Sequence, residues 1–194
     1  MQRRDALLAL AAGAVSPALA RADTSAAGAA RSANLTAEIE ALLRRTEETW
    51  NAQDTAKLRD LWDRDDADPY YLAGEQENWF IGWDQLNRYL VPQGRRVVDA
   101  IRVKFYDVHA RLLAPDLAFA AFWMRTDMKV VFSPKPFGSD NRVSAVLRRK
   151  SDGWRYICYA EAFQAPTLYF QKLTEKDVAP DYAEFYQHLK ERKP

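Results

Sequence analysis

The chain has few of the residues that cross-link a protein or bind a metal ion. Its 194 residues include one cysteine, Cys158, and two histidines, His109 and His188. A single cysteine excludes a disulfide within the chain. Two distant histidines with one cysteine do not match the ligand spacing of a zinc site. The sequence therefore predicts a protein that is stabilised by packing and that needs neither a metal nor another cofactor.

Several functional motifs are also missing. No G-x-G-x-x-G or P-loop spacing predicts a nucleotide site, and no serine lies in the G-x-S-x-G motif of hydrolases. The 28 basic and 27 acidic residues leave a net charge of +1. A domain that binds phosphate backbones usually shows a strong basic excess on one face, so we expect no nucleic-acid partner.

A stretch almost without charge lies at the N-terminus. Arg3 and Arg4 precede an apolar run over residues 6–15, and small residues near position 20 offer a cleavage site. This pattern predicts an export signal over residues 1–22 and a periplasmic protein, and the paired arginines are typical of the twin-arginine route. The run is too short to span a bilayer, so we expect no membrane partner once it is removed. Residues 23–33, rich in Ala, Ser and Gly, predict a disordered linker.

From residue 34 the pattern is that of a folded domain. Helical spacing predicts a helix from Thr36 to about Ala52, a short second helix after Asp54, and a third that begins at Gly82. Alternating apolar residues predict strands over 70–73, 101–106, 117–131, 142–150 and 154–163, with a hairpin turn at 151–153. This order predicts an α+β fold in which helices cover one face of a curved antiparallel sheet. Rings in the tail, residues 166–194, suggest a strap or a last helix.

Three phrases within this domain carry a resemblance: ETWNAQDTAKL at 48–58, GWDQL at 82–86 and RVSAVLRRKSDGWRY at 142–156. They resemble the SnoaL-like branch of the superfamily named after nuclear transport factor two, over residues 34–165. The resemblance implies a cone-shaped sheet with three N-terminal helices on its concave face, a cofactor-free pocket between them, and a homodimer. The superfamily includes ketosteroid isomerase, polyketide cyclases and plain binding domains, so the fold alone does not give an activity.

The first candidate site lies in DPYYLAGEQENWFIGWDQL, residues 68–86, which interleaves rings with carboxylates. Glu75 would be surrounded by Tyr71, Trp79 and Trp83. Partial loss of water would raise its pKa toward the range that suits proton transfer. We predict Glu75 as a catalytic base and the three rings as substrate contacts. The alternative is an exposed loop glutamate.

The second candidate is Glu161. Strand alternation places it on one face with Tyr159, Ile157 and Arg155. An isolated buried carboxylate is costly, so we expect a partner among Arg125, Arg142 and His109. Two interpretations of Glu161 remain open, a catalytic carboxylate in a pocket and a structural ion pair. Tyr159 is a predicted substrate contact.

Two further candidates are Arg125 and His109. Arg125 shares a strand face with Trp123, and together they could hold a phenolate or enolate oxygen. The alternative is that Arg125 pairs with Asp127. His109 is a candidate acid or base.

A narrower resemblance joins YYLAGE at 70–75, YAEA at 159–162 and APTLY at 165–169. These segments resemble exported SnoaL-like proteins of lignin-degrading bacteria, some of which release formaldehyde from a two-ring lignin dimer to leave a stilbene. The resemblance implies a cofactor-independent lyase or isomerase acting on a small aromatic compound. The alternatives are a non-catalytic binding domain for a hydrophobic ligand and a structural dimer. The structural dimer predicts an apolar outer sheet face, whereas Arg102 and Lys104 alternate outward.

Overall fold

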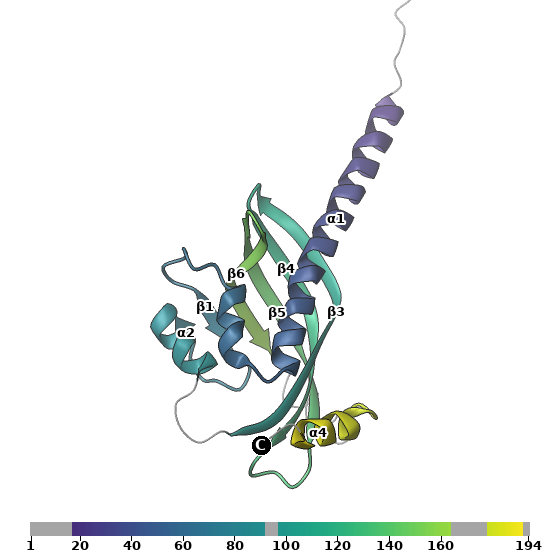
Figure 1. Ribbon diagram of the computed structural model, residues 1–194. Coiled ribbons are helices and arrows are strands. Elements are labelled where there is room, and N and C mark those ends of the chain that lie inside the picture. The colour runs from purple at the N-terminus through teal and green to yellow at the C-terminus, as the bar shows by residue number, and fades with distance from the viewer. Residues whose placement is uncertain (1–16, 92–96, 164–177, 192–194) are drawn as a thin grey trace, which may run out of the picture.

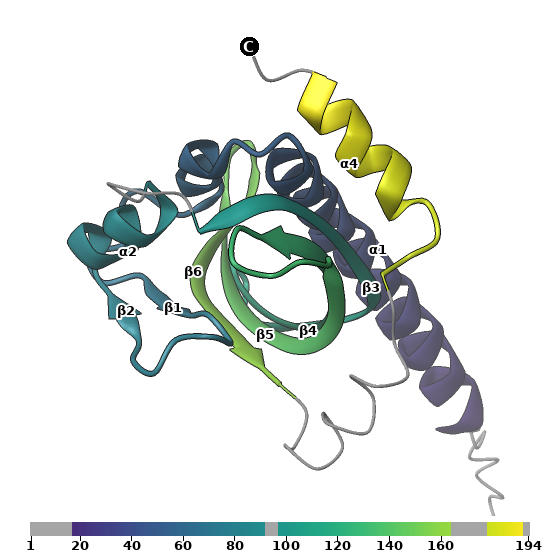
Figure 2. The same ribbon diagram turned by 90° about the horizontal axis from the view of Figure 1, so that it is seen from below.

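The computed structural model describes residues 17–91, 97–163 and 178–191. It contains a six-stranded sheet in the order β2-β1-β6-β5-β4-β3. The bounds of the elements are α1 (Pro17–Asn51), η1 (Thr55–Leu61), β1 (Tyr70–Leu72), β2 (Phe80–Ile81), α2 (Trp83–Leu90), β3 (Val98–Ala114), β4 (Leu117–Val130), β5 (Phe137–Lys150), β6 (Gly153–Ala162) and α4 (Tyr182–Glu191). The sheet is strongly curved and not closed (Figure 2), and the predicted α+β class is confirmed.

The helices differ from the prediction in length and type. The first begins at Pro17 instead of Thr36, so residues 23–33, predicted as a disordered linker, lie within α1. Alanine is the strongest helix former and is frequent in that stretch. This part of α1 extends beyond the sheet (Figure 1). Because η1 is a 3-10 helix and α2 is short, the expected set of three N-terminal α-helices is not found in that form. Residues 1–16, which carry most of the predicted export signal, lie outside the described residues.

No helix of the described ranges combines the length and the apolar character needed to cross a membrane. The helix suggested for the tail is α4, which lies beside β3 (Figure 2). Residues 164–177, the first part of the predicted C-terminal extension, also lie outside the described residues.

The sheet confirms the long antiparallel strands and the hairpin turn between Lys150 and Gly153. It is nevertheless mixed, because β1 pairs in parallel with β6. One face of β4 is buried, through Ala118, Ala120 and Phe122. The same core includes residues of α1, η1 and α2, among them Ile39, Leu42, Leu58, Leu61, Leu86 and Leu90. The core therefore lies between the helices and the concave face of the sheet.

The open edge of the sheet, on β3, is covered by amide side chains from the end of α1. Asn51 accepts a hydrogen bond from the backbone N–H of Val103 at 2.7 Å and donates to its carbonyl oxygen at 3.1 Å. Gln53 makes the same pair of bonds with Ile101, at 3.0 and 2.6 Å. Unpaired strand edges invite pairing with other chains, so these side chains protect the edge of the sheet.

Replacing Gln53 tests this arrangement. Its φ is +61°, a backbone conformation that glycine adopts without strain. Gln53→Gly therefore removes the side chain with little added backbone strain and leaves the amide and carbonyl of Ile101 without their partner. We expect the free energy of unfolding to fall by about 1–3 kcal/mol, measured by urea denaturation. An unchanged midpoint would show that water replaces the side chain at this edge.

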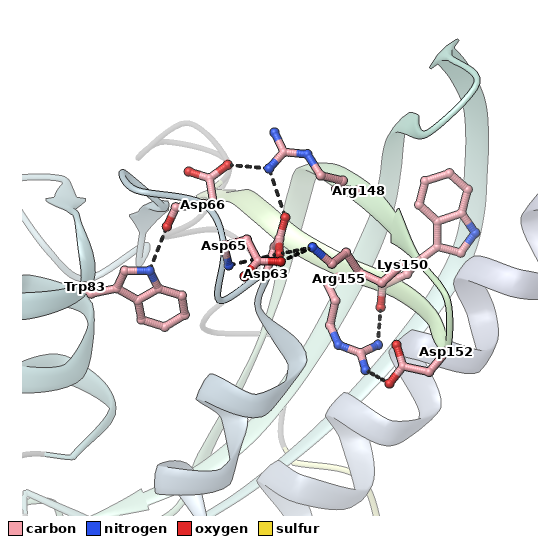
Figure 3. Close-up of polar contacts among 9 residues, drawn as sticks. Asp63, Asp65, Asp66, Trp83, Arg148, Lys150, Asp152 and Arg155 are labelled. Atoms are coloured by element: carbon pink, nitrogen blue, oxygen red, sulfur yellow. Dashed lines mark hydrogen bonds and ion pairs between the residues drawn. The ribbon is translucent and has the colours of Figure 1, made fainter.

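A cluster of ion pairs ties the loop after η1 to the end of β5 (Figure 3). Asp63 is buried and lies 2.9 Å from both Arg148 and Lys150, while Asp66 and Asp65 pair with the same two cations at 3.1 and 2.6 Å. Burial alone would raise the pKa of Asp63, but hydrogen bonds from Lys150 and Arg148 hold it below its ordinary value. The cluster satisfies its own charges, so we assign it a structural role.

Candidate active site

Glu161 lies near the end of β6, on the face of the sheet that the helices cover. Its partner across the ladder is Val143, and Tyr159 stands opposite Ala145; both of these β5 residues are buried. Tyr159 therefore shares the face of Glu161, as predicted. Ile157 and Arg155 do not share it, because the pairing of β6 with β5 shifts there: Val146 pairs with Cys158, but Leu147 pairs with Tyr156. This bulge places Tyr156 and Trp154 in the core instead, and simple alternation does not detect it.

Three neutral groups donate hydrogen bonds to the carboxylate of Glu161. The hydroxyl of Tyr71 reaches Oε1 at 3.0 Å, and Oε2 accepts from the backbone N–H of Gly74 at 3.3 Å and from Nδ2 of Asn141 at 3.2 Å. None of the ion pairs found among the described residues includes Glu161. The prediction of a cationic partner for Glu161 is therefore wrong. Arg142, one of the expected partners, donates instead to the carbonyl of Phe163.

These surroundings favour the neutral form of the carboxyl group. Burial is the largest cause and the nearby negative charge of Glu75 is the second; both raise the pKa of Glu161, while the hydrogen bonds from Tyr71, Gly74 and Asn141 lower it. The net result is a pKa of about 7, against an ordinary value of 4.5. Such a group is present in both forms at neutral pH and can serve as an acid or as a base.

Gly74 lies close to the ring of Phe163. A Cβ atom at this position would lie 2.8 Å from the ring of Phe163. The turn that contains it is closed by a bond from the N–H of Gln76 to the carbonyl of Ala73, at 3.1 Å. A larger residue at this position would require the ring of Phe163 to move. The backbone N–H of Gly74 is therefore a donor to the site.

Aromatic rings pack beside Glu161. The ring of Tyr71 lies with its centroid 5.4 Å from that of Tyr159 and 5.1 Å from that of Tyr89, which in turn lies 4.6 Å from Phe80. The hydroxyl of Tyr159 donates to Sδ of Met124 at 3.4 Å. Tyr71 and Tyr159 also line a hollow of about 30 Å³, together with residues of α1, η1 and α2. That is about the room one water molecule takes in the liquid, so an aromatic molecule fits only if these side chains move.

Glu75 is exposed, but it remains connected to the site. Its Oε1 accepts a hydrogen bond from the hydroxyl of Tyr89 at 2.7 Å. Trp79 and Trp83, predicted to surround it, lie elsewhere. Trp79 is 43% exposed and packs against Tyr70, and the indole N–H of Trp83 donates to the carbonyl of Asp66 at 2.7 Å (Figure 3).

The structure does not bring Trp123, Arg125 or His109 to Glu161. The core face of β4 carries Phe122 and Met124, so Trp123 and Arg125 lie on its other face. There Trp123 stacks on Tyr106 at 6.3 Å. Arg125 pairs with Asp127 at 2.7 Å, which was the alternative weighed for it. His109 is exposed and contacts Asp107 at 3.1 Å.

A larger hollow, of about 280 Å³, lies near Arg125. It is bounded by the end of α1, by β3 and β4 and by the segment before α4, and its lining includes Arg102, Asp127 and Asp181. Arg102 forms ion pairs with Asp127 at 3.0 Å and with Asp181 at 2.9 Å. Glu161 and its rings do not line this hollow. Its size alone does not make it the site, because Arg102, Asp127 and Asp181 already form ion pairs.

Sequence reasoning missed Asn141 and Tyr89. Asn141 is 4% exposed, and its Oδ1 is buried without a hydrogen-bond partner. The predicted strand began at Arg142; extending its alternation by one residue places Asn141 on the core face with Val143. A buried amide oxygen without a partner is costly, so this oxygen is available to accept a further hydrogen bond.

A cone-shaped sheet with helices on its concave face and a carboxyl group among aromatic rings defines a protein of the nuclear transport factor 2-like superfamily. The SnoaL-like domain family matches residues 39–164, and the chain belongs to that family. No protein of curated function matches the sequence significantly.

Solved structures show the same fold. A nuclear transport factor 2-like superfamily protein from Salmonella enterica superposes with a TM-score of 0.57 at 15% identity, covering 70% of this chain and 94% of its own. A candidate scytalone dehydratase from Novosphingobium aromaticivorans has a TM-score of 0.57 at 9% identity, with 66% and 82% covered. A candidate dehydratase from Streptomyces avermitilis has a TM-score of 0.53 at 14% identity, with 66% and 95% covered. At these identities the likeness establishes the fold alone.

Proposed function

We propose that the protein is a cofactor-independent lyase or isomerase that acts on a small aromatic compound, with Glu161 as its acid–base group. The observation that carries this proposal is the carboxyl group of Glu161, which is held by three neutral donors beside aromatic rings and has a pKa of about 7. An enzyme gains most from a proton-transfer group whose pKa lies near the working pH. The dehydratase descriptions of two structural neighbours agree with elimination chemistry.

The specific version follows the lignin resemblance and involves a phenolic two-ring propanediol. Protonated Glu161 gives its proton to the benzylic hydroxyl group, which leaves as water while the para phenolate supplies electrons and forms a neutral quinone methide. The carboxylate of Glu161 then takes the proton of the terminal hydroxyl group. The bond between the terminal carbon and the carbon that carries the second ring breaks, its electrons form the stilbene double bond and restore the phenolate, and formaldehyde and a stilbene are released. Glu161 ends protonated, as it began.

The protein contributes position and exclusion of water to this sequence. Tyr71, Tyr89 and Phe80 provide apolar surface next to Glu161, and the free Oδ1 of Asn141 can accept a hydrogen bond from a substrate hydroxyl group. When the protein holds the reacting groups in the right orientation, less entropy is lost on reaching the transition state than in the uncatalysed reaction. Because the present hollow is small, substrate binding requires Tyr71 or Tyr159 to shift.

Incubation with phenolic lignin dimers that carry the terminal hydroxyl group tests this version. We expect formaldehyde and stilbene absorbance to appear in equal amounts. The matched control is the same dimer with its para phenol methylated, which cannot form the quinone methide and should not react. Failure of every phenolic dimer would exclude the lignin version and leave the broader acid–base proposal to be tested on other aromatic alcohols.

The second candidate is a binding domain for a small hydrophobic ligand, which the apolar lining of the hollow favours. A binding domain would retain ligand affinity after Glu161→Gln, because its rings supply the contact area. An enzyme would lose turnover in the same variant. Export to the periplasm and a homodimer remain predictions from the sequence.

A further inference from the structure

We propose that Glu75 and Glu161 form a coupled pair of carboxylates, joined by the hydroxyl groups of Tyr71 and Tyr89, in which Glu75 is a positioning residue that acts on Glu161. This inference rests on the proposed function, because it concerns the protonation of the group assigned to the chemistry. It adds Glu75 to the site, an exposed residue that does not contact the substrate pocket.

The contacts form a continuous chain. The hydroxyl of Tyr71 donates to Oε1 of Glu161 at 3.0 Å, and that of Tyr89 donates to Oε1 of Glu75 at 2.7 Å. The two tyrosine rings lie 5.1 Å apart, which brings their hydroxyl groups close to each other. Thus two tyrosines, Tyr71 buried and Tyr89 partly buried, lie between an enclosed carboxylate and an exposed one.

The single hydroxyl hydrogen of Tyr71 makes this chain responsive to charge. When Glu161 is ionised, Tyr71 donates to it. When Glu161 is protonated, its own hydrogen can be donated to the oxygen of Tyr71, which then donates to Tyr89, while Tyr89 donates to ionised Glu75. A proton on Glu161 therefore strengthens the bonds that stabilise the negative charge on Glu75.

Few other ionisable groups face this chain. From β1 and β6 come Tyr71 and Tyr159, and from α2 comes Tyr89; burial raises the pKa of all three hydroxyl groups, with the charge of Glu161 or Glu75 adding to it. Among the described residues no lysine, arginine or histidine contributes a hydrogen bond to either carboxylate. The charge of Glu75 is therefore the main external influence on the protonation of Glu161.

A titration by NMR tests the proposal without any substrate. The protein is labelled with ¹³C at the glutamate carboxyl carbons, and Glu161→Gln assigns the signal of Glu161. We expect the midpoint of Glu161 to move to lower pH in Glu75→Gln, because a like charge is removed. Glu77→Gln is the matched control, since it removes an exposed carboxylate two residues away and should leave the midpoint unchanged.

Tyr89→Phe completes the experiment as a double-mutant cycle. If Tyr89 holds Glu75 in place, Glu75→Gln shifts the Glu161 midpoint less in the Tyr89→Phe background than in the wild type. An equal shift in both backgrounds, or no shift in either, overturns the coupled pair while leaving Glu161 as the reacting group. A wild-type midpoint near 4.5 would instead remove the support for the proposed function itself.

Discussion

Glu161→Gln is expected to lower turnover by about two to four orders of magnitude, the usual contribution of a positioned acid–base group. The amide keeps the size of the side chain and an oxygen that can accept from Tyr71, but it cannot exchange a proton. The loss should therefore appear in kcat with little change in ligand affinity. The measurement is steady-state formation of product from any aromatic substrate that the wild type converts.

The control for this experiment is Glu48→Gln, which changes an exposed glutamate on α1 in the same chemical way. We expect wild-type turnover from it. The pH dependence provides a second check. If the ionised form acts as the base in the slow step, kcat/KM rises as the pH rises through about 7, and Glu161→Gln lacks this limb. Wild-type turnover in Glu161→Gln would exclude Glu161 from the chemistry.

The same substitution should change how stability depends on pH. The pKa of Glu161 is raised by folding from 4.5 to about 7, so between these values the folded state binds more protons than the unfolded state. The free energy of unfolding therefore falls as the pH rises through this window. The loss is about 3 kcal/mol, is complete above pH 7 and is absent below pH 4.5.

Glu161→Gln cannot ionise, so we expect it to lack this loss and to gain stability relative to the wild type as the pH rises. Urea unfolding at pH 5 and pH 8 measures the difference. Glu48→Gln is again the control, and it should follow the wild type at both values. Parallel pH dependence of the wild type and Glu161→Gln would show that the folded protein does not raise the pKa of Glu161.

Together these predictions describe a group held in a costly environment. Strain and unfavourable burial persist at functional sites when the rest of the fold over-determines them. Here the burial of Glu161 comes from β5, β6 and the turn at Gly74, and the ion pairs of Asp63 stabilise a different part of the molecule. Gains in stability from Glu161→Gln and loss of turnover would therefore occur together.

The local sequence determined the elements that depend on near neighbours. Alternation predicted the long strands, the Asp152–Gly153 pair predicted the hairpin turn, and Gly82 preceded a helix as expected. Rings and carboxylates in one short stretch drew attention to Tyr71 and Glu75. The same reasoning grouped Trp79 and Trp83 with them, because nearness along the chain says nothing about which side chains turn outward.

Only the tertiary structure decided which of these residues meet. The bulge in β6, the parallel pairing of β1 with β6 and the packing of α2 bring Glu161, Asn141 and Tyr89 together from segments far apart in the sequence. They also leave Trp123 and Arg125 on the opposite face of the sheet. Pairing register and strand order depend on contacts between distant segments, which a pattern of neighbouring residues does not contain.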